Sequence, residues 1–233
     1  MIRRIRITWP DPRPFTGRDG APIRLLAASD DPDPALEHDV NRVALAPIDG
    51  IVGCGDLDAA WLDFLAGAFR APLVYVRGNH DRGGSWDESE ASLPPPLAAG
   101  RTTHLAGITI GGLEWPGVDE RGNGRHAYVA WRHALGLARR VLVARLRGRA
   151  EPILVISHVP PTGAGADATD AYHRGFSAYR WLLERLRPPL WLHGHTTTAS
   201  VKALQIEVAG TILVNVTGAV LVELLPPTAG GQG

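Results

Sequence analysis

Five residues that can bind a metal ion or move a proton each closely follow a short apolar run of the chain. They are Asp30, Asp56, Asn79, His158 and His195, and the runs before them cover residues 22–29, 49–54, 72–76, 153–157 and 190–192. Carboxylate, amide and imidazole groups together suit Mn, Fe or Zn better than Ca. A single Asp behind a strand is most often a helix cap, but five such residues at the same end of successive runs indicate a metal site.

The apolar runs themselves predict the elements that position these residues. Runs of this length are typical of strands buried on both faces, and the carboxyl ends of such strands converge on one crevice. Helical spacing of apolar residues predicts helices over 58–69, 126–146 and 176–186. Further strands are expected at 108–110, 201–207, 211–216 and 219–224.

These strands are more than one sheet comfortably holds. We therefore expect an α/β fold of four layers, in which two stacked mixed β-sheets are flanked by helices. No repeat or strong linker interrupts the sequence, so residues 1–233 are predicted to form a single domain. Its core would cover about 22–225, and the last residues would be disordered.

Composition excludes several classes of protein. Lys plus Arg equals Asp plus Glu at 24 each, so the net charge does not indicate nucleic-acid binding. The sequence holds no apolar run of about 18 residues, so no membrane span and no membrane partner are expected. The N-terminal residues lack a signal-peptide pattern, which predicts a cytoplasmic protein. The single cysteine, Cys54, lies in an apolar run and is interpreted as a buried structural thiol.

Four ordered blocks of sequence resemble those of the calcineurin-like metallophosphoesterases. The blocks are Gly55-Asp56, Gly78-Asn79-His80-Asp81, Ser157-His158 and His193-Gly194-His195, and the second is the most specific. The resemblance runs from about residue 23 to 224, and the segment His173-Arg174-Gly175-Phe176 is similar to a bacterial subgroup of the family. The metallophosphoesterase fold, with its two sheets, is implied.

The resemblance also implies a function, a cofactor and a set of residue roles. The protein would hydrolyse a phosphomonoester or phosphodiester, on a phosphorylated small molecule or nucleotide, by attack of metal-activated hydroxide on phosphorus. One or two divalent ions (Mn, Fe or Zn) would be bound. By position, Asp56 would bridge two metals, Asn79, His158 and His195 would complete the second, and Asp30 would hold the first. His80 would be the general acid, with Asp81 orienting its ring.

Two positions depart from the family pattern. The family usually has Asp-x-His where this chain has Asp30-Asp31-Pro32, and Gly-His-x-His where it has Gly194-His195-Thr196-Thr197. Both missing histidines belong, by resemblance, to the first metal. Three interpretations stay open: substitute ligands, with Asp33 or Asp31 nearest; one tight and one weak metal; or binding of a phosphorylated ligand without turnover. The Asp-Asp-Pro-Asp-Pro segment is equally a turn and helix-start sequence.

Polar and aromatic residues of the long loops are further candidates. Phosphate contacts could come from Arg121, Arg125, His126, His173 and Arg174, since arginine binds phosphate through two parallel hydrogen bonds. Trp86 and Trp115 could stack a nucleobase or fasten their loops to the body. Asp58 is interpreted as the N-cap of the helix at 58–69, and His193 either lines the site or packs in the core.

Three functions are therefore compared. The leading one is a metal-dependent phosphoric ester hydrolase. The second is a catalytically impaired protein that binds or senses a phosphate ligand, and it rests on Pro32 and Thr197. The third needs no metal, with the Asp and Asn residues as caps and the histidines structural; Gly-Asn-His-Asp has no capping rationale, which disfavours this third function.

Overall fold

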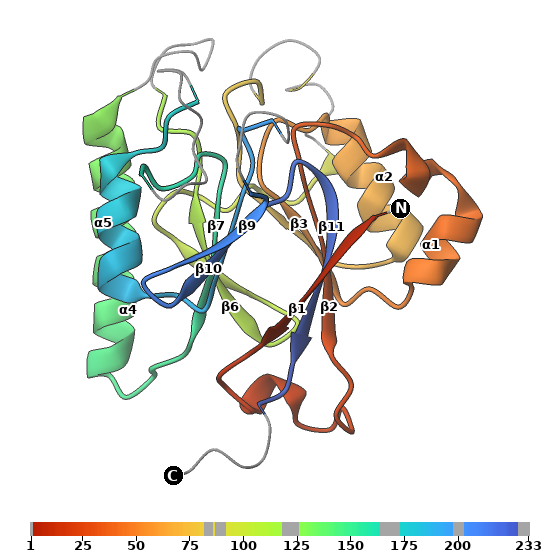
Figure 1. Ribbon diagram of the computed structural model, residues 1–233, viewed down its shortest axis with the longest axis horizontal. Helices are drawn as coiled ribbons and strands as arrows, with labels where there is room; N and C mark the ends of the chain where they lie inside the picture. The colour runs from red at the N-terminus through yellow and green to blue at the C-terminus, as the bar shows by residue number, and fades with distance from the viewer. Residues whose placement is uncertain are drawn as a thin grey trace.

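The structure, a computed structural model, describes residues 2–81, 86, 92–117, 126–163, 173–197 and 203–227. In these residues the strands form two mixed sheets. The first sheet has the order β1 (Arg3–Thr8), β11 (Gly218–Leu225), β2 (Ile23–Ser29), β3 (Gly50–Gly53) and β4 (Leu73–Tyr75). The second has the order β5 (Thr102–Leu105), β6 (Ile108–Leu113), β7 (Ile153–Ser157), β8 (Leu190–His193), β10 (Thr211–Asn215) and β9 (Gln205–Val208). The two sheets stack, as Figure 1 shows.

Within each sheet the strands that precede the candidate site residues are parallel. β2, β3 and β4 run parallel in the first sheet, and β6, β7, β8 and β10 run parallel in the second. Antiparallel pairing brings in β11 beside β2, β5 beside β6 and β9 beside β10. The carboxyl ends of β2, β3, β4, β7 and β8 are therefore the ends from which the site must be built.

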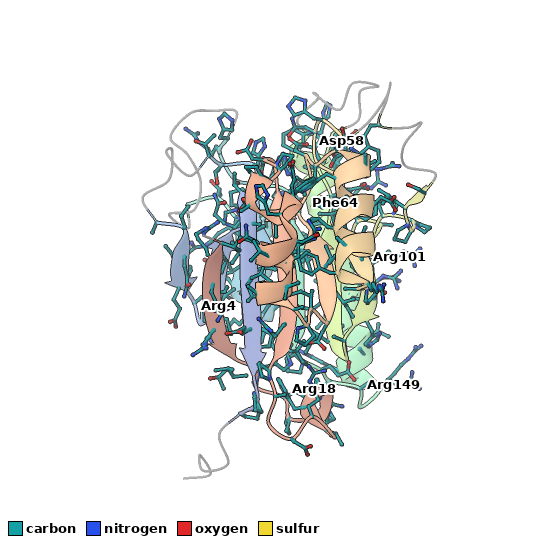
Figure 2. The ribbon with its side chains drawn as sticks, turned by 90° about the vertical axis from the view of Figure 1, so that its right-hand side faces the viewer. Arg4, Arg18, Asp58, Phe64, Arg101 and Arg149 are labelled. Atoms are coloured by element: carbon teal, nitrogen blue, oxygen red, sulfur yellow. The ribbon has the colours of Figure 1, made fainter. Side chains whose placement is uncertain are left out.

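Helices cover the outer faces of both sheets. α1 (Asp39–Leu45) and α2 (Ala59–Phe69) lie on the first sheet, and α4 (Ala127–Leu146) and α5 (Ser177–Leu186) lie on the second (Figure 1). Two short 3-10 helices lie in connecting segments: η1 (Arg13–Phe15) between β1 and β2, and η2 (Pro34–Glu37) between β2 and α1. Asp58 accepts a hydrogen bond from the Ala60 amide at 2.9 Å, which confirms it as the N-cap of α2. Figure 2 shows Asp58 at one end of α2.

Three apolar clusters match this layering. The largest lies between the sheets and includes Leu25, Val52, Leu154 and Val220. The second joins the second sheet to α4 and α5, and the third joins the first sheet to α1 and α2. Cys54 is fully buried in the inter-sheet cluster, and burial raises the pKa of its thiol, so the interpretation as a structural thiol is confirmed.

The sequence predicted the two stacked sheets and three of the four long helices of the described residues. It missed β1, β5 and α1. β1 pairs in parallel with β11 from Arg3 to Thr8, so the first sheet begins well before residue 22. The strands expected over 211–216 and 219–224 form, but they belong to different sheets. Residues 228–233, expected to be disordered, lie outside the described residues. No helix among the described residues is long and apolar enough to cross a membrane.

Candidate metal centre

The backbone at the strand ends is turned sharply at three of the predicted site residues. Asp30, Asp56 and His195 have φ values of 61°, 54° and 65°, in the left-handed region that side chains other than glycine rarely adopt. Such conformations cost about 1–3 kcal/mol each and persist where the surrounding structure imposes them, commonly at functional sites. The glycines beside them allow the loops to approach one another. A Cβ on Gly78 would collide with the Asp56 side chain, and one on Gly194 would collide with Ser29 and Asp30.

His158 is the centre of the arrangement. It is fully buried, and its Nδ1 lies 2.9 Å from the carbonyl oxygen of Cys54. Because a carbonyl oxygen only accepts, Nδ1 carries the proton that is donated. The other ring nitrogen, Nε2, then faces the site. It lies 3.2 Å from Asp56 Oδ2, 3.0 Å from Asn79 Oδ1 and 3.1 Å from His195 Nδ1.

This convergence tests whether a metal fits the residues present. The Nε2 atom of His158 carries at most one proton, so it cannot donate hydrogen bonds to a carboxylate, an amide oxygen and a second imidazole at the same time. The donor atoms of Asp56, His158 and His195 all lie within 4.8 Å of one another. The group is therefore short of positive charge, and its mixture of oxygen and nitrogen donors suits a borderline divalent cation. The residues present fit the second metal of the predicted pair.

The same shortage of positive charge perturbs the titration of the group. Burial alone would lower the pKa of His158, but the neighbouring Asp56 carboxylate outweighs it and raises the pKa to about 9. Burial would raise the pKa of Asp56, and the His158 imidazole with the His80 amide brings it below the ordinary value. Desolvation raises the pKa of Asp30. Without a cation, a proton shared with Asp56 is what holds the cluster together.

His80 stands at the exposed side of the cluster. Its amide donates to Asp56 Oδ1 at 2.8 Å, and its ring Nε2 lies 4.0 Å from Asp56 Oδ2. The side chain is 72% exposed and lines a cavity of about 420 Å³. The ring is therefore open to a ligand in the cavity, and the general-acid role of His80 stays a prediction.

The role predicted for Asp81 is wrong in its geometry. Its carboxylate is buried and does not hold the His80 ring. Oδ2 accepts hydrogen bonds from the amides of Asp56 and Gly78, each at 2.7 Å. Burial raises the pKa of this carboxyl to about 6. Asp81 therefore ties the loop after β4 to the loop after β3, and acts on the site by fixing where Asp56 lies.

Of the two residues predicted as substitute ligands for the first metal, Asp31 lines the cavity and Asp33 does not. Asp33 does not line the cavity: its Oδ1 caps η2 by accepting from the Ala35 amide at 2.9 Å, so the capping alternative is the one observed. The neighbouring Asp31 lines the cavity, together with Asp30, Thr197 and Thr217. The Asp30 carboxylate accepts from the His195 amide at 3.0 Å and from Thr217 Oγ1 at 3.1 Å. The first site is thus surrounded by oxygen atoms.

Thr217 was not predicted from the sequence. It sits in the turn between β10 and β11, and nothing in its local pattern separates it from other turn residues. Only the pairing of β11 with β2 brings this turn beside Asp30. A pattern read along the chain does not reveal such a neighbour.

The loop candidates divide into three groups. His173 lines the cavity, with its ring centre 5.1 Å from that of His195. Arg174 is exposed and is not among the cavity-lining residues, while Arg121 and Arg125 lie outside the described residues.

Trp86 and Trp115 are both buried, which disfavours the stacking interpretation. Trp115 packs beneath the site, 5.1 Å from the His195 ring and 6.1 Å from the His158 ring between centroids. His193 is buried in β8 and is likewise not among the cavity-lining residues.

Comparison with known proteins agrees with this fold. A family model described as calcineurin-like phosphoesterase matches residues 46–198. The chain belongs to the calcineurin-like phosphoesterase family.

Solved structures share the fold at low sequence identity. The protein TT1561 of Thermus thermophilus is 19% identical with a TM-score of 0.54, and the match covers 84% of this chain and 90% of that one. A dimetal phosphatase from Danio rerio is 12% identical with a TM-score of 0.51, covering 85% of this chain and 88% of that one. No curated protein matches the sequence.

Proposed function

We propose that this protein is a metal-dependent phosphoesterase that hydrolyses a phosphomonoester or phosphodiester carried by a small molecule or nucleotide. The observation that carries the proposal is the convergence of Asp56, Asn79 and His195 on the Nε2 atom of His158. These residues would hold one cation, and Asp30 with Asp56 would contribute to a second. When bound, the cations supply neutralisation of phosphate oxygens and acidification of an attacking water.

The chain's own residues account for the remaining chemistry. His80 lines the cavity with an exposed ring, so it can donate a proton to the oxygen that leaves phosphorus, a contribution of typically about 10²–10⁴-fold. His173 lines the same cavity and can donate to a non-bridging phosphate oxygen. Asp81 fixes the two loops that carry Asp56 and His80. Trp115 closes the floor of the site with an apolar ring.

Hydrolysis of chromogenic phosphomonoesters and phosphodiesters by chelator-stripped protein tests the function. Turnover should require added Mn²⁺, Fe²⁺ or Zn²⁺ and should be lost in Asp56→Asn. His80→Asn should lower kcat by about 10²-fold or more while leaving cation binding intact. His104→Asn is a matched control, because His104 is an exposed histidine on β5. Full cation occupancy with no turnover on either ester class would contradict the proposal.

A second candidate function is suggested by the oxygen-rich first site. Pro32 and Thr197 stand where the family usually has histidines, and Thr197 lines the cavity. On this alternative the protein binds a phosphorylated ligand without hydrolysing it. Thr197→His combined with Pro32→His would then raise both cation stoichiometry and hydrolysis. If the parent protein already turns over esters and the double variant is no faster, the alternative fails.

A further inference from the structure

The outward face of α4 carries an unusual set of exposed apolar side chains. The large apolar side chains that are exposed in the described residues are Val40 and Val43 on α1 and six residues of α4: Tyr128, Trp131, Leu135, Leu142, Val143 and Leu146. Tyr128, Leu135 and Leu142 recur every seven residues and so lie on one side of the helix. Leu135, Leu142 and Leu146 are 51%, 55% and 78% exposed.

This stripe is not the side by which α4 holds to the domain. The buried residues Ala130, Ala134, Leu137 and Val141 form the opposite side and pack against the second sheet and α5. A helix with apolar residues on both sides is typically covered on both. Contiguous exposed apolar residues mark surfaces that contact a partner or a membrane.

The charges along this segment are of one sign. Residues 126–150 contain six arginines and no Asp or Glu, although the whole chain has equal numbers of basic and acidic residues. The arginines are Arg132, Arg139, Arg140, Arg145, Arg147 and Arg149. Within the part of the chain that the structure describes, none of them pairs with a carboxylate. Burial, and then the like charges of Arg101 and Arg139, lower the pKa of Arg140.

A cavity of about 340 Å³ lies between the carboxyl end of α4 and the second sheet, on the side of the helix that carries Val141 and not the stripe. Arg140, Arg145 and Arg149 line it, and so do His104 and Arg13. The acidic residue that lines it, Glu151, is engaged by Thr109 at 2.6 Å, His104 at 3.5 Å and Arg13 at 3.6 Å. On α5, which packs beside α4, Glu184 is paired with Arg180 at 2.7 Å. The acidic residues closest to the arginines of α4 are therefore already paired with other groups.

We infer that α4 docks the protein on a membrane surface rich in anionic phospholipid, with the apolar stripe at the acyl boundary and the arginines on headgroup phosphates. A second copy of the chain is a poorer occupant, because pairing two α4 helices would bring arginines of the same sign together. A basic helix with an exposed apolar and aromatic face is typical of interfacial binding. The helix has 20 residues, or about 30 Å, which allows several lipid contacts.

Docking by this face leaves the metal centre accessible. α4 and α5 form one outer layer of the molecule, whereas the centre lies at the carboxyl ends of the strands between the sheets (Figure 1). In Figure 2, Asp58 is near the top of the molecule and Arg149 is near the bottom right. Arg4 is at the left of the same view, away from Arg149. The exposed Arg4 of β1 is therefore a useful control position.

Co-sedimentation with lipid vesicles tests the inference on the full chain. Wild type should sediment with vesicles of equal parts phosphatidylcholine and phosphatidylglycerol, should not sediment with phosphatidylcholine alone, and should be released by salt. Leu135→Gln with Leu142→Gln should abolish sedimentation, and so should Arg145→Glu with Arg149→Glu, since each basic charge strengthens binding about fivefold. These side chains are exposed, so folding should be retained, as circular dichroism would verify.

The matched controls are Val40→Gln with Val43→Gln, which remove exposed apolar residues elsewhere, and Arg4→Glu. Both should bind vesicles like wild type. The inference is overturned if wild type ignores anionic vesicles, or if the Leu135 and Leu142 variant binds them as well as wild type. A wild-type dimer in sedimentation velocity that the same variant dissociates would also overturn it, and would assign the face to self-association.

Discussion

At the scale of single residues, the buried carboxylate of Asp81 is the clearest case of a side chain whose role is set by backbone contacts. Its Oδ2 accepts from two amides that belong to different loops. One of these amides is that of Asp56, which also bonds to His158. The position of the central carboxylate therefore depends on a residue that does not face the cavity.

Asp81→Ala and Asp81→Asn should differ in stability. Alanine leaves two amides without an acceptor, which costs about 1–3 kcal/mol for each buried group. Asparagine keeps a carbonyl oxygen in place and should lose much less. Urea unfolding of the two variants measures the difference. Equal loss in both would contradict the acceptor role, and a normal kcat in Asp81→Asn would confirm that the residue does not orient His80.

At the scale of elements, the site depends on loops that approach one another closely at two glycines, where any larger residue would collide with the neighbouring loop. Gly78 lies against Asp56, and Gly194 lies against Ser29 and Asp30. The first contact joins the ends of β3 and β4 within one sheet, and the second joins the end of β8 in the other sheet to the end of β2.

Gly194→Ala should push the loop after β8 away from Asp30, destabilise the fold and weaken cation binding together. The matched control is Gly67→Ala on α2, where nothing lies within 4 Å of the added Cβ. In that exposed helix position alanine should stabilise by about 0.5–1 kcal/mol. Thermal unfolding with and without Mn²⁺ measures both effects. A Gly194→Ala protein with the wild-type Mn²⁺ shift would contradict the close-approach argument.

At the scale of the whole molecule, stability without a cation should depend on pH through His158. Its folded pKa of about 9 lies above the unfolded value near 6.5. The stabilisation is therefore fully present below about pH 6.5 and is lost as pH rises through 9. The pKa of Asp81, raised to about 6, adds a second loss of stability as pH rises from about 4 to 6.

Urea unfolding of chelator-stripped protein between pH 6 and 9.5 measures this dependence. His158→Gln should flatten the alkaline part of the profile. Added Mn²⁺ should reverse the trend, because a cation competes with the proton for the same donors and binds better as pH rises. A flat wild-type profile over that range would show that His158 is not held protonated.

The sequence was sufficient for most of the elements and for the positions of most of the candidate site residues, because both depend on local pattern. Each buried strand is an apolar run followed by polar residues, and this pattern pointed to Asp30, Asp56, Asn79, His158 and His195 before the structure was known. It could not distinguish Asp33 from Asp31, since both fit a turn and only the backbone of η2 decides which one caps. The role of Asp81 and the presence of Thr217 depend on contacts between distant segments. β1 was missed because alternating arginines at a sheet edge resemble an exposed segment.

The central claim is that Asp56, Asn79, His158 and His195 form a cation centre, and equilibrium binding of Mn²⁺ to chelator-stripped protein tests it most directly. We predict at least one bound ion per chain in wild type, none in a variant carrying His158→Gln and His195→Gln, and wild-type binding in the exposed control His104→Gln. A wild-type protein that binds no ion, or a double variant that binds as wild type does, would contradict the account.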